Sequence, residues 1–109
     1  MAKIEDFSQF DIRVGKIIDV SELEGARKPI YILRIDFGKM GLKSIAAGIK
    51  GSYSKEELIG KFIAAIINLE PKNIAGFVSE GMILAAEDDD KHLSILTLDK
   101  SVLEGAQVH

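Results

Sequence analysis

The residue types that most often perform catalysis are scarce in this chain. Its two histidines are His92, at the expected start of a strand, and His109, the last residue, and it has no cysteine. We find no Ser–His–Asp set, no metal-ligand spacing and no glycine-rich phosphate loop. The acidic run Glu87–Asp90 has enough carboxylates for a hard cation, but it lacks the spacing and glycine of a calcium loop. We therefore expect a solvated turn there, and a protein that is not an enzyme and uses no cofactor or metal.

Two polar stretches carry residue types that can bind nucleic acid. The first, Glu24–Pro29, contains the cations Arg27 and Lys28, which can contact phosphate or can simply keep an exposed turn soluble. The second, residues 68–82, joins two short apolar runs and contains a proline and two glycines, which favour a fixed loop conformation. Its candidate ligand-binding residues are Asn68, Lys72, Asn73, Phe77, Ser79 and Met82.

Several of these side chains have a structural alternative to ligand binding. Asn68 can satisfy loop backbone, Ser79 can cap a turn, and Met82 can fill the core. Phe77 can stack on a base or on a peptide side chain, or it can pack as a core phenylalanine. The sequence leaves both alternatives open at each position.

The elements that must position these stretches are mainly strands. Period-two patterns and short apolar runs predict strands over 11–18, 30–37, 44–49, 61–68, 82–86 and 92–98, the last buried on both faces. A capping box from Ser54 to Glu57 predicts a short helix between the third and fourth strands. Three strands, a helix and two strands is the order of the OB-fold, an all-β, five-stranded Greek-key barrel. In the first strand we expect Gly15 to mark a bulge, and Asp11 and Arg13 to form an intramolecular ion pair.

This architecture brings the two polar stretches together. OB-folds hold nucleic acid on the face of the second and third strands, between the first and fourth inter-strand loops. Arg27 and Lys28 fall on the first of these loops, and Lys72 and Asn73 fall on the other. We expect the two pairs to flank one groove.

Length and composition set further limits. The chain of 109 residues, 47% of them apolar, predicts one domain over 1–109 with a substantial core. It shows no apolar signal region and no apolar run near the roughly 20 residues that cross a bilayer, so we expect a cytoplasmic protein outside the membrane. The net charge is −3, but Glu87–Asp90 alone supplies four negative charges. A locally positive groove is compatible with that distribution.

Four motifs make the chain resemble the tRNA-binding domain family. They are Asp11–Ile17, Ala47–Ile49, Tyr53–Lys61, and the stretch 68–82 with its Asn-Leu-Glu-Pro-Lys and Ser-Glu-Gly-Met sequences. The family includes C-terminal domains and beta subunits of methionyl-tRNA synthetases, free-standing tRNA-binding proteins and CsaA secretion chaperones. The resemblance implies structure-specific, non-catalytic tRNA binding in a groove that uses Asn68, Ser79 and Met82. It also implies a methionyl-tRNA synthetase catalytic subunit as a candidate partner.

The motifs do not all favour one branch of this family. Ala26–Pro29 resembles the CsaA branch, which binds unfolded polypeptide, whereas Ser79–Met82 and Ala46–Ile49 resemble the tRNA-binding branch. The family usually has two cations after the proline, and here Lys72–Asn73 gives one charge fewer. Binding of tRNA is our first hypothesis and binding of unfolded polypeptide is the alternative. A third hypothesis is an oligomerising scaffold without an RNA partner.

Both ends of the chain favour assembly with a second copy. Ile4, Phe7 and Phe10 are spaced three apart, on one side of a short helical turn that can plug its own barrel or dock on a partner. The segment after the last strand adds apolar residues that a small barrel does not need: Val102, Leu103 and Val108. In the family that the chain resembles, these two segments build a dimer interface, so we expect a two-fold homodimer.

Replacing Phe7 with Asp should shift this homodimer to monomer or to aggregate, because the substitution places an unpaired charge in the interface. Light scattering measures the mass of both proteins directly. A native protein that is monomeric at roughly tens of micromolar would contradict the expected assembly.

Overall fold

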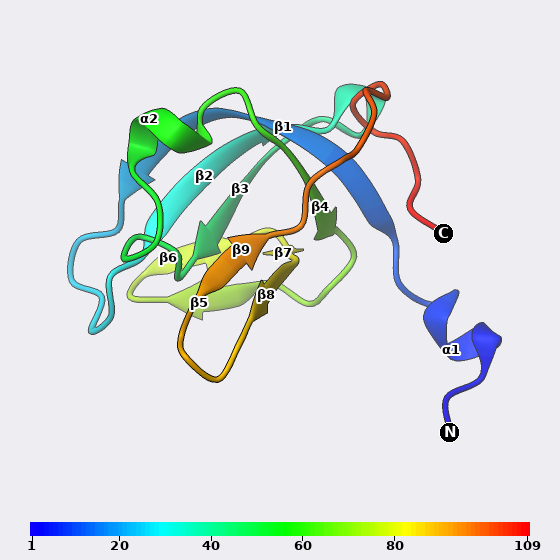
Figure 1. The fold of residues 1–109 in the computed structure, drawn as a ribbon, viewed down its shortest axis with the longest axis horizontal. Coiled ribbons are helices and arrows are strands. Elements are labelled where there is room, and N and C mark those ends of the chain that lie inside the picture. Colours follow the sequence, from blue (N-terminus) through cyan, green and yellow to red (C-terminus); the bar gives the residue numbers. More distant parts are fainter.

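The computed structural model describes all residues from 1 to 109. Its centre is an antiparallel sheet of five strands in the order β3-β2-β1-β4-β7 (Figure 1). These strands are β1 (Ile12–Glu22), β2 (Tyr31–Asp36), β3 (Leu42–Ala47), β4 (Phe62–Ile66) and β7 (Met82–Ile83). The sheet curls until β7 also lies beside β3, and the short helix α2 (Lys55–Leu58) connects β3 to β4. The predicted all-β barrel of the OB-fold type is confirmed.

The remaining elements are short. There are two hairpins. One pairs β5 (Lys72–Ile74) with β6 (Phe77–Ser79), and the other pairs β8 (Ala85–Glu87) with β9 (Leu93–Ile95). There are also two short helical segments, α1 (Ile4–Phe7) and η1 (Gly38–Met40). None of the helices has the length and apolar content needed to span a membrane. The expected strand over 92–98, buried on both faces, is wrong in extent, because β9 ends at Ile95 and Leu96 is exposed.

The core forms from the inward-facing residues of the barrel strands, together with Leu58 from α2. The predicted capping box fixes the start of α2: Ser54 Oγ accepts from Glu57 N at 3.2 Å, and the Glu57 carboxylate accepts from Ser54 N at 2.9 Å. That second bond, from the Ser54 amide, is the main reason that the pKa of Glu57 lies below its ordinary value. The cap fixes the start of α2, and Leu58 at the end of this helix is fully buried in the barrel core.

Gly15 lies where β1 passes close beneath two core side chains. A Cβ atom at this position would stand 2.5 Å from Ile35 Cγ2 and 2.6 Å from Phe37 Cε1, closer than packed carbon atoms approach. The strand irregularity predicted at Gly15 occurs instead between Ile17 and Asp19, where the pairing of β1 with β2 shifts. The glycine therefore provides space for the core, and the bulge follows it.

The C-terminal segment docks along the first half of β1. Gly105 N donates to Val14 O at 2.7 Å, and Val14 N donates to Ala106 O at 2.9 Å. The predicted ion pair is also present, with 2.6 Å between Arg13 Nε and Asp11 Oδ1. Arg13 Nη1 adds a bond to Gly105 O at 3.1 Å, so the same guanidinium holds both ends of the chain.

Apolar side chains remain exposed at both ends. No residue of α1 is buried, and Ile4 and Leu103 keep 74% and 82% of their surface accessible. Figure 1 shows α1 standing away from the barrel, with both termini on the same side of the molecule. The homodimer through Ile4, Phe7, Phe10, Val102, Leu103 and Val108 stays a prediction that this arrangement favours.

Gly15→Ala should lower the free energy of unfolding by about 1–3 kcal/mol, because its methyl group must displace Ile35 or Phe37. Gly48→Ala is the matched control, since a Cβ at Gly48 meets no atom within 4 Å. Urea unfolding followed by circular dichroism measures both variants. Equal stabilities for the two would show that the core yields around Gly15.

Candidate nucleic-acid interface

The hairpin β5–β6 is the feature of the 68–82 stretch that sequence reasoning did not predict. Ile74 pairs with Phe77 across a two-residue turn formed by Ala75 and Gly76. Both turn residues have positive φ, 49° and 86°, as in the type I′ turns that suit hairpin twist. Asn73 Oδ1 accepts from Gly76 N at 2.9 Å and fixes the turn, so Asn73 has a structural role here.

The pleat of this hairpin divides the predicted ligand-binding residues between two faces. Successive side chains on a strand point to opposite sides, and paired residues share a side. The pairs Lys72–Ser79 and Ile74–Phe77 therefore lie on one face, and the pair Asn73–Val78 lies on the other. Lys72, Phe77 and Ser79 can act together, whereas Asn73 is directed away from them.

Ser79 and Glu80 close the barrel against the edge of β3. Ser79 Oγ accepts from Ala46 N and donates to Gly81 O, both at 3.0 Å. Glu80 bonds Ser44 twice: its carboxylate accepts from Ser44 N at 3.0 Å, and its amide donates to Ser44 O at 3.0 Å. Ser79 is only 4% exposed, so its hydroxyl serves the fold. Its predicted contact with RNA stays a prediction that the burial does not favour.

A hollow of about 290 Å³ lies between this hairpin and the barrel, and we name it the central groove. Four of its lining residues are apolar, and Met82 among them keeps 47% of its surface exposed. The groove is lined by Ala46, Leu69, Glu70, Lys72, Ile74, Ser79, Gly81 and Met82. Lys72 and Met82, both predicted as ligand-binding residues, thus line one cavity.

A second hollow of about 370 Å³, which we name the loop hollow, lies between the β1–β2 loop and the hairpin tip. Arg27 and Lys28 line it together with Ala26, Ile30, Ile74 and Ala75. Ile74 lines both hollows, so the two predicted flanks adjoin through this side chain. Sequence reasoning missed Ile74, because it is one of several apolar residues in the 68–82 stretch and nothing in its type marks it as a site residue.

The cations of this surface take part in no ion pair, whereas Arg13, Lys50 and Lys55 do. Glu22 pairs with both Lys50 and Lys55, and none of the ion pairs involves Arg27, Lys28 or Lys72. Two carboxylates, Glu70 and Glu80, lie in or beside the central groove. The surface therefore carries unpaired cations in both hollows, with the carboxylates of Glu70 and Glu80 at the central groove.

Asn68 lies at the entrance to the groove and is engaged in bonds within the chain. Its Oδ1 accepts from Asp11 N and its Nδ2 donates to Gln9 O, both at 2.8 Å. Asn68 therefore satisfies backbone groups, which is the structural alternative to ligand binding given for it above. These groups lie 57 and 59 residues away along the chain. Phe77 is half-buried beside Ile74. Contacts of Asn68 and Phe77 with RNA stay predictions.

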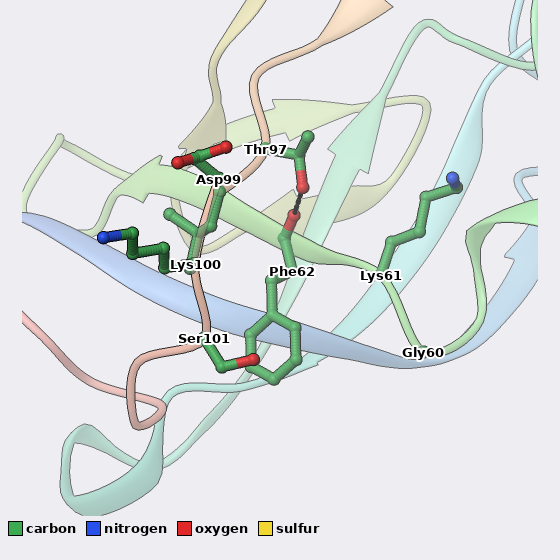
Figure 2. A pocket seen from close by; sticks show the side chains of 8 residues that line it. Gly60, Lys61, Phe62, Thr97, Asp99, Lys100 and Ser101 are labelled. Atoms are coloured by element: carbon green, nitrogen blue, oxygen red, sulfur yellow. Dashed lines mark hydrogen bonds between the residues drawn. The ribbon is translucent and has the colours of Figure 1, made fainter.

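Another hollow, between the start of β4 and the chain that follows β9, does not concentrate charge. Figure 2 shows Lys61 and Lys100 pointing to opposite sides of it, while Thr97 Oγ1 donates to Phe62 O at 2.8 Å. Two cations that diverge cannot hold one anion between them. This hollow is therefore a seam between β4 and the chain that follows β9.

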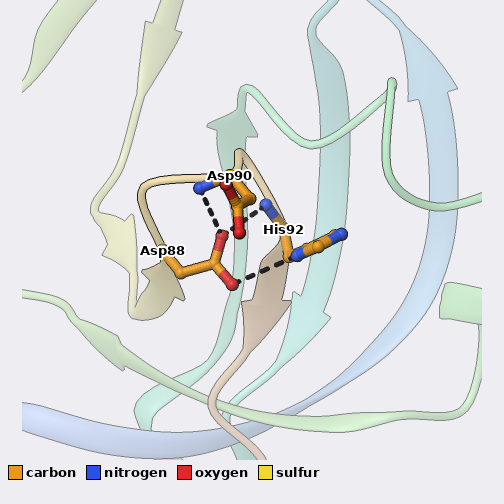
Figure 3. Close-up of side chains that lie close together, drawn as sticks. All are labelled: Asp88, Asp90 and His92. Carbon is orange, nitrogen blue, oxygen red and sulfur yellow. Dashed lines mark hydrogen bonds and ion pairs between the residues drawn. The ribbon is translucent and has the colours of Figure 1, made fainter.

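The acidic turn between β8 and β9 brings together three side chains that could contact a cation. The ligand atoms of Asp88, Asp90 and His92 lie within 4.8 Å of one another, and all three residues are exposed (Figure 3). Asp88 Oδ1 already accepts from the amides of Asp90 and His92, at 3.0 and 2.9 Å. The bond from the His92 amide is the main cause of the lowered pKa of Asp88. The cluster is a capped turn, as the sequence led us to expect.

Comparisons with known proteins agree with this fold. A family model described as "Putative tRNA binding domain" matches residues 12–107. The methionine–tRNA ligase of Pyrococcus horikoshii is 45% identical over 106 residues, which are 97% of this chain and 14% of that enzyme. The CsaA chaperone of Picrophilus torridus superposes with a TM-score of 0.92 and 43% identity, covering 100% of both chains. A MetRS-related protein of Pyrococcus horikoshii gives a TM-score of 0.91 at 29% identity, covering 100% of this chain and 98% of its own.

The fold and the groove define a β-barrel binding domain of the OB-fold class. The chain belongs to the tRNA-binding domain family, as its matched residues and its identity to these relatives show. It spans about 14% of the length of the curated relatives it matches, so it corresponds to one domain of those enzymes.

Ser79→Ala should destabilise the fold by about 1–3 kcal/mol, because it removes two bonds and leaves the Ala46 amide without its partner. Ser94→Ala is a control of the same chemistry, since Ser94 is exposed and its hydroxyl makes only a weak 3.3 Å bond to a neighbouring carbonyl. Chemical unfolding measures both. If Ser79→Ala reduced RNA binding while stability stayed unchanged, the structural role assigned to Ser79 would be wrong.

Proposed function

We propose that this chain is a non-catalytic domain that binds tRNA by its folded shape. The observation that carries this proposal is the meeting of the β1–β2 loop and the β5–β6 hairpin around Ile74. Their free cations, Arg27, Lys28 and Lys72, are placed to contact phosphate groups at the two ends of one surface. Membership of the tRNA-binding domain family supports this ligand class.

Neither hollow is lined by an aromatic residue, which favours folded RNA over single strands. Proteins that bind single strands stack successive bases on aromatic side chains. Here the Tyr31 hydroxyl donates to Tyr53 O and the Tyr53 hydroxyl accepts from Ile95 N, so both tyrosines are engaged within the barrel. Phe37 is fully buried, and Phe77, half-buried, is the aromatic residue nearest the hollows. Contacts to a folded backbone suit such a surface better than base stacking.

A modest electrostatic attraction is consistent with this mode of binding. The chain carries a net charge of −3, and the carboxylates of Glu70 and Glu80 lie in or beside the central groove, near Lys72. Phosphate contacts supply most nonspecific affinity for nucleic acid. A ligand must therefore place phosphates near the cations of both hollows and away from Glu70 and Glu80, and this requirement favours an RNA of fixed shape.

We assign the domain an auxiliary role in aminoacylation. A bound tRNA raises its own effective concentration at an attached or associated enzyme, and no chemical step is needed from the domain itself. The relatedness to part of methionine–tRNA ligases makes a methionyl-tRNA synthetase catalytic subunit the first partner to test. Because tRNA functions in the cytoplasm, we place the domain there.

Binding of unfolded polypeptide is the second candidate function. The apolar lining of the central groove, from Ala46, Leu69, Ile74 and Met82, suits an apolar peptide side chain. The superposition on a CsaA chaperone supports the same alternative. The two functions differ in their response to salt, because a peptide contact in this groove requires no phosphate.

Lys28→Ala and Lys72→Ala should each weaken binding to all tRNAs and flatten the dependence of log K on log salt by about 0.7–0.9. Met82→Ala should weaken binding by about 1–3 kcal/mol with the slope unchanged, since Met82 contacts base or sugar rather than phosphate. Fluorescence anisotropy over a salt series measures all three variants.

Lys100→Ala is the matched control for this series, because Lys100 lies in the seam of Figure 2, outside both hollows. Circular dichroism must show a native fold for every variant. If Lys100→Ala flattened the slope as much as Lys28→Ala and Lys72→Ala, the attraction would be diffuse and the proposed site would be wrong.

A further inference from the structure

The segment that precedes β1 is tied to the entrance of the central groove by a single side chain. Asn68 bonds the Asp11 amide through Oδ1 and the Gln9 carbonyl through Nδ2, each at 2.8 Å. Beside it, Ile67 N donates to Asp11 O at 2.9 Å. Three hydrogen bonds therefore fix residues 9–11 against the end of β4.

The groove wall begins with the residue that follows Asn68. Leu69 and Glu70 line the central groove, and neither they nor Pro71 take part in any hydrogen bond of the structure. This part of the wall is therefore held only at its two ends, by Asn68 and by the pairing of Lys72 in the hairpin. A shift of Asn68 must move the wall.

Asp11 connects this entrance to the two ends of the chain. Its amide and carbonyl bond Asn68 and Ile67, while its carboxylate pairs with Arg13 Nε at 2.6 Å. Arg13 also donates to the carbonyl of Gly105 in the C-terminal segment. The Arg13 side chain lines neither hollow, and its polar contacts are those with Asp11 and Gly105.

We infer that Asn68 is a positioning residue, and that Asn68, Asp11 and Arg13 couple the N-terminal helix α1 to the affinity of the groove for RNA. This inference rests on the proposed function. In it, Asn68 acts on tRNA through the wall at Leu69 and Glu70 and does not contact the RNA. Because coupling between two sites is reciprocal, fixing α1 strengthens RNA binding, and RNA binding orders residues 9–11. Assembly of two copies through the exposed apolar face of α1 is then linked to RNA binding.

A double-mutant cycle tests the coupling in the full chain. Asn68→Ala removes both bonds, and Arg13→Lys keeps the charge but removes the forked contact with Asp11 and Gly105. Each single variant should weaken tRNA binding by about three- to tenfold. The double variant should bind tRNA no more weakly than the single variant that has the lower affinity. Thr97→Ala, which removes a 2.8 Å bond to Phe62 of β4 on another side of the barrel, should leave tRNA binding unchanged.

The response of hydrogen exchange to tRNA supplies a readout that a purely structural role would not change. The Asp11 amide exchanges faster in Asn68→Ala simply because its acceptor is lost. In the native protein, however, its exchange should slow when tRNA is bound, and in Asn68→Ala this slowing should be absent. Asn73→Ala is a control for this measurement, because the Asn73 side chain bonds only within its own hairpin.

Two results would overturn the coupling while the native protein still bound tRNA. In the first, the fold-losses in tRNA affinity of the two single variants multiply in the double variant. In the second, Arg13→Lys binds tRNA with native affinity. Either result would mean that Asn68 acts on RNA independently of Arg13, by direct contact. A native protein that binds no tRNA would overturn the proposed function, and the coupling with it. The affinity of the native protein therefore distinguishes the two failures.

Discussion

The structure depends on how the exposed edge of β3 is closed. The amides of Ser44 and Ala46 need acceptors, and they receive them from the side chains of Glu80 and Ser79. The bond of the Ala46 amide is partly buried, so losing its acceptor would cost more than the net value of an ordinary hydrogen bond. Because Ser79 also ends β6, the same contacts that close the barrel hold the hairpin β5–β6 beside it. The central groove is a consequence of that closure.

The distribution of charge explains how an acidic chain can present a surface for RNA. Glu22 pairs with both Lys50 and Lys55, while the cations of the β1–β2 loop and of the hairpin stay unpaired. The acidic turn caps itself through Asp88 on the separate hairpin β8–β9. The net charge of −3 is thus a poor guide to the groove. Screening over about 8 Å at physiological salt makes the local arrangement more important than the sum.

The sequence predicted the features that local patterns determine. The strand order, the capping box at Ser54, and the ion pair of Asp11 with Arg13 are confirmed. The hairpin β5–β6 escaped prediction because its three-residue strands are too short to show a period and its turn places an alanine, Ala75, at positive φ. The hydrogen bonds of Asn68 with Asp11 and of Ser79 with Ala46 were not predicted, because the partners lie 57 and 33 residues apart along the chain. No local pattern reveals a bond of that span.

The central claim is that the groove selects RNA by its folded shape. Competition binding at near-physiological salt tests it most directly, with intact tRNA, an unstructured RNA of equal length and an unfolded polypeptide as the three ligands. The account predicts that intact tRNA binds more tightly than the unstructured RNA and displaces any bound polypeptide. Equal affinity for the two RNAs, or binding of the polypeptide alone, would contradict it.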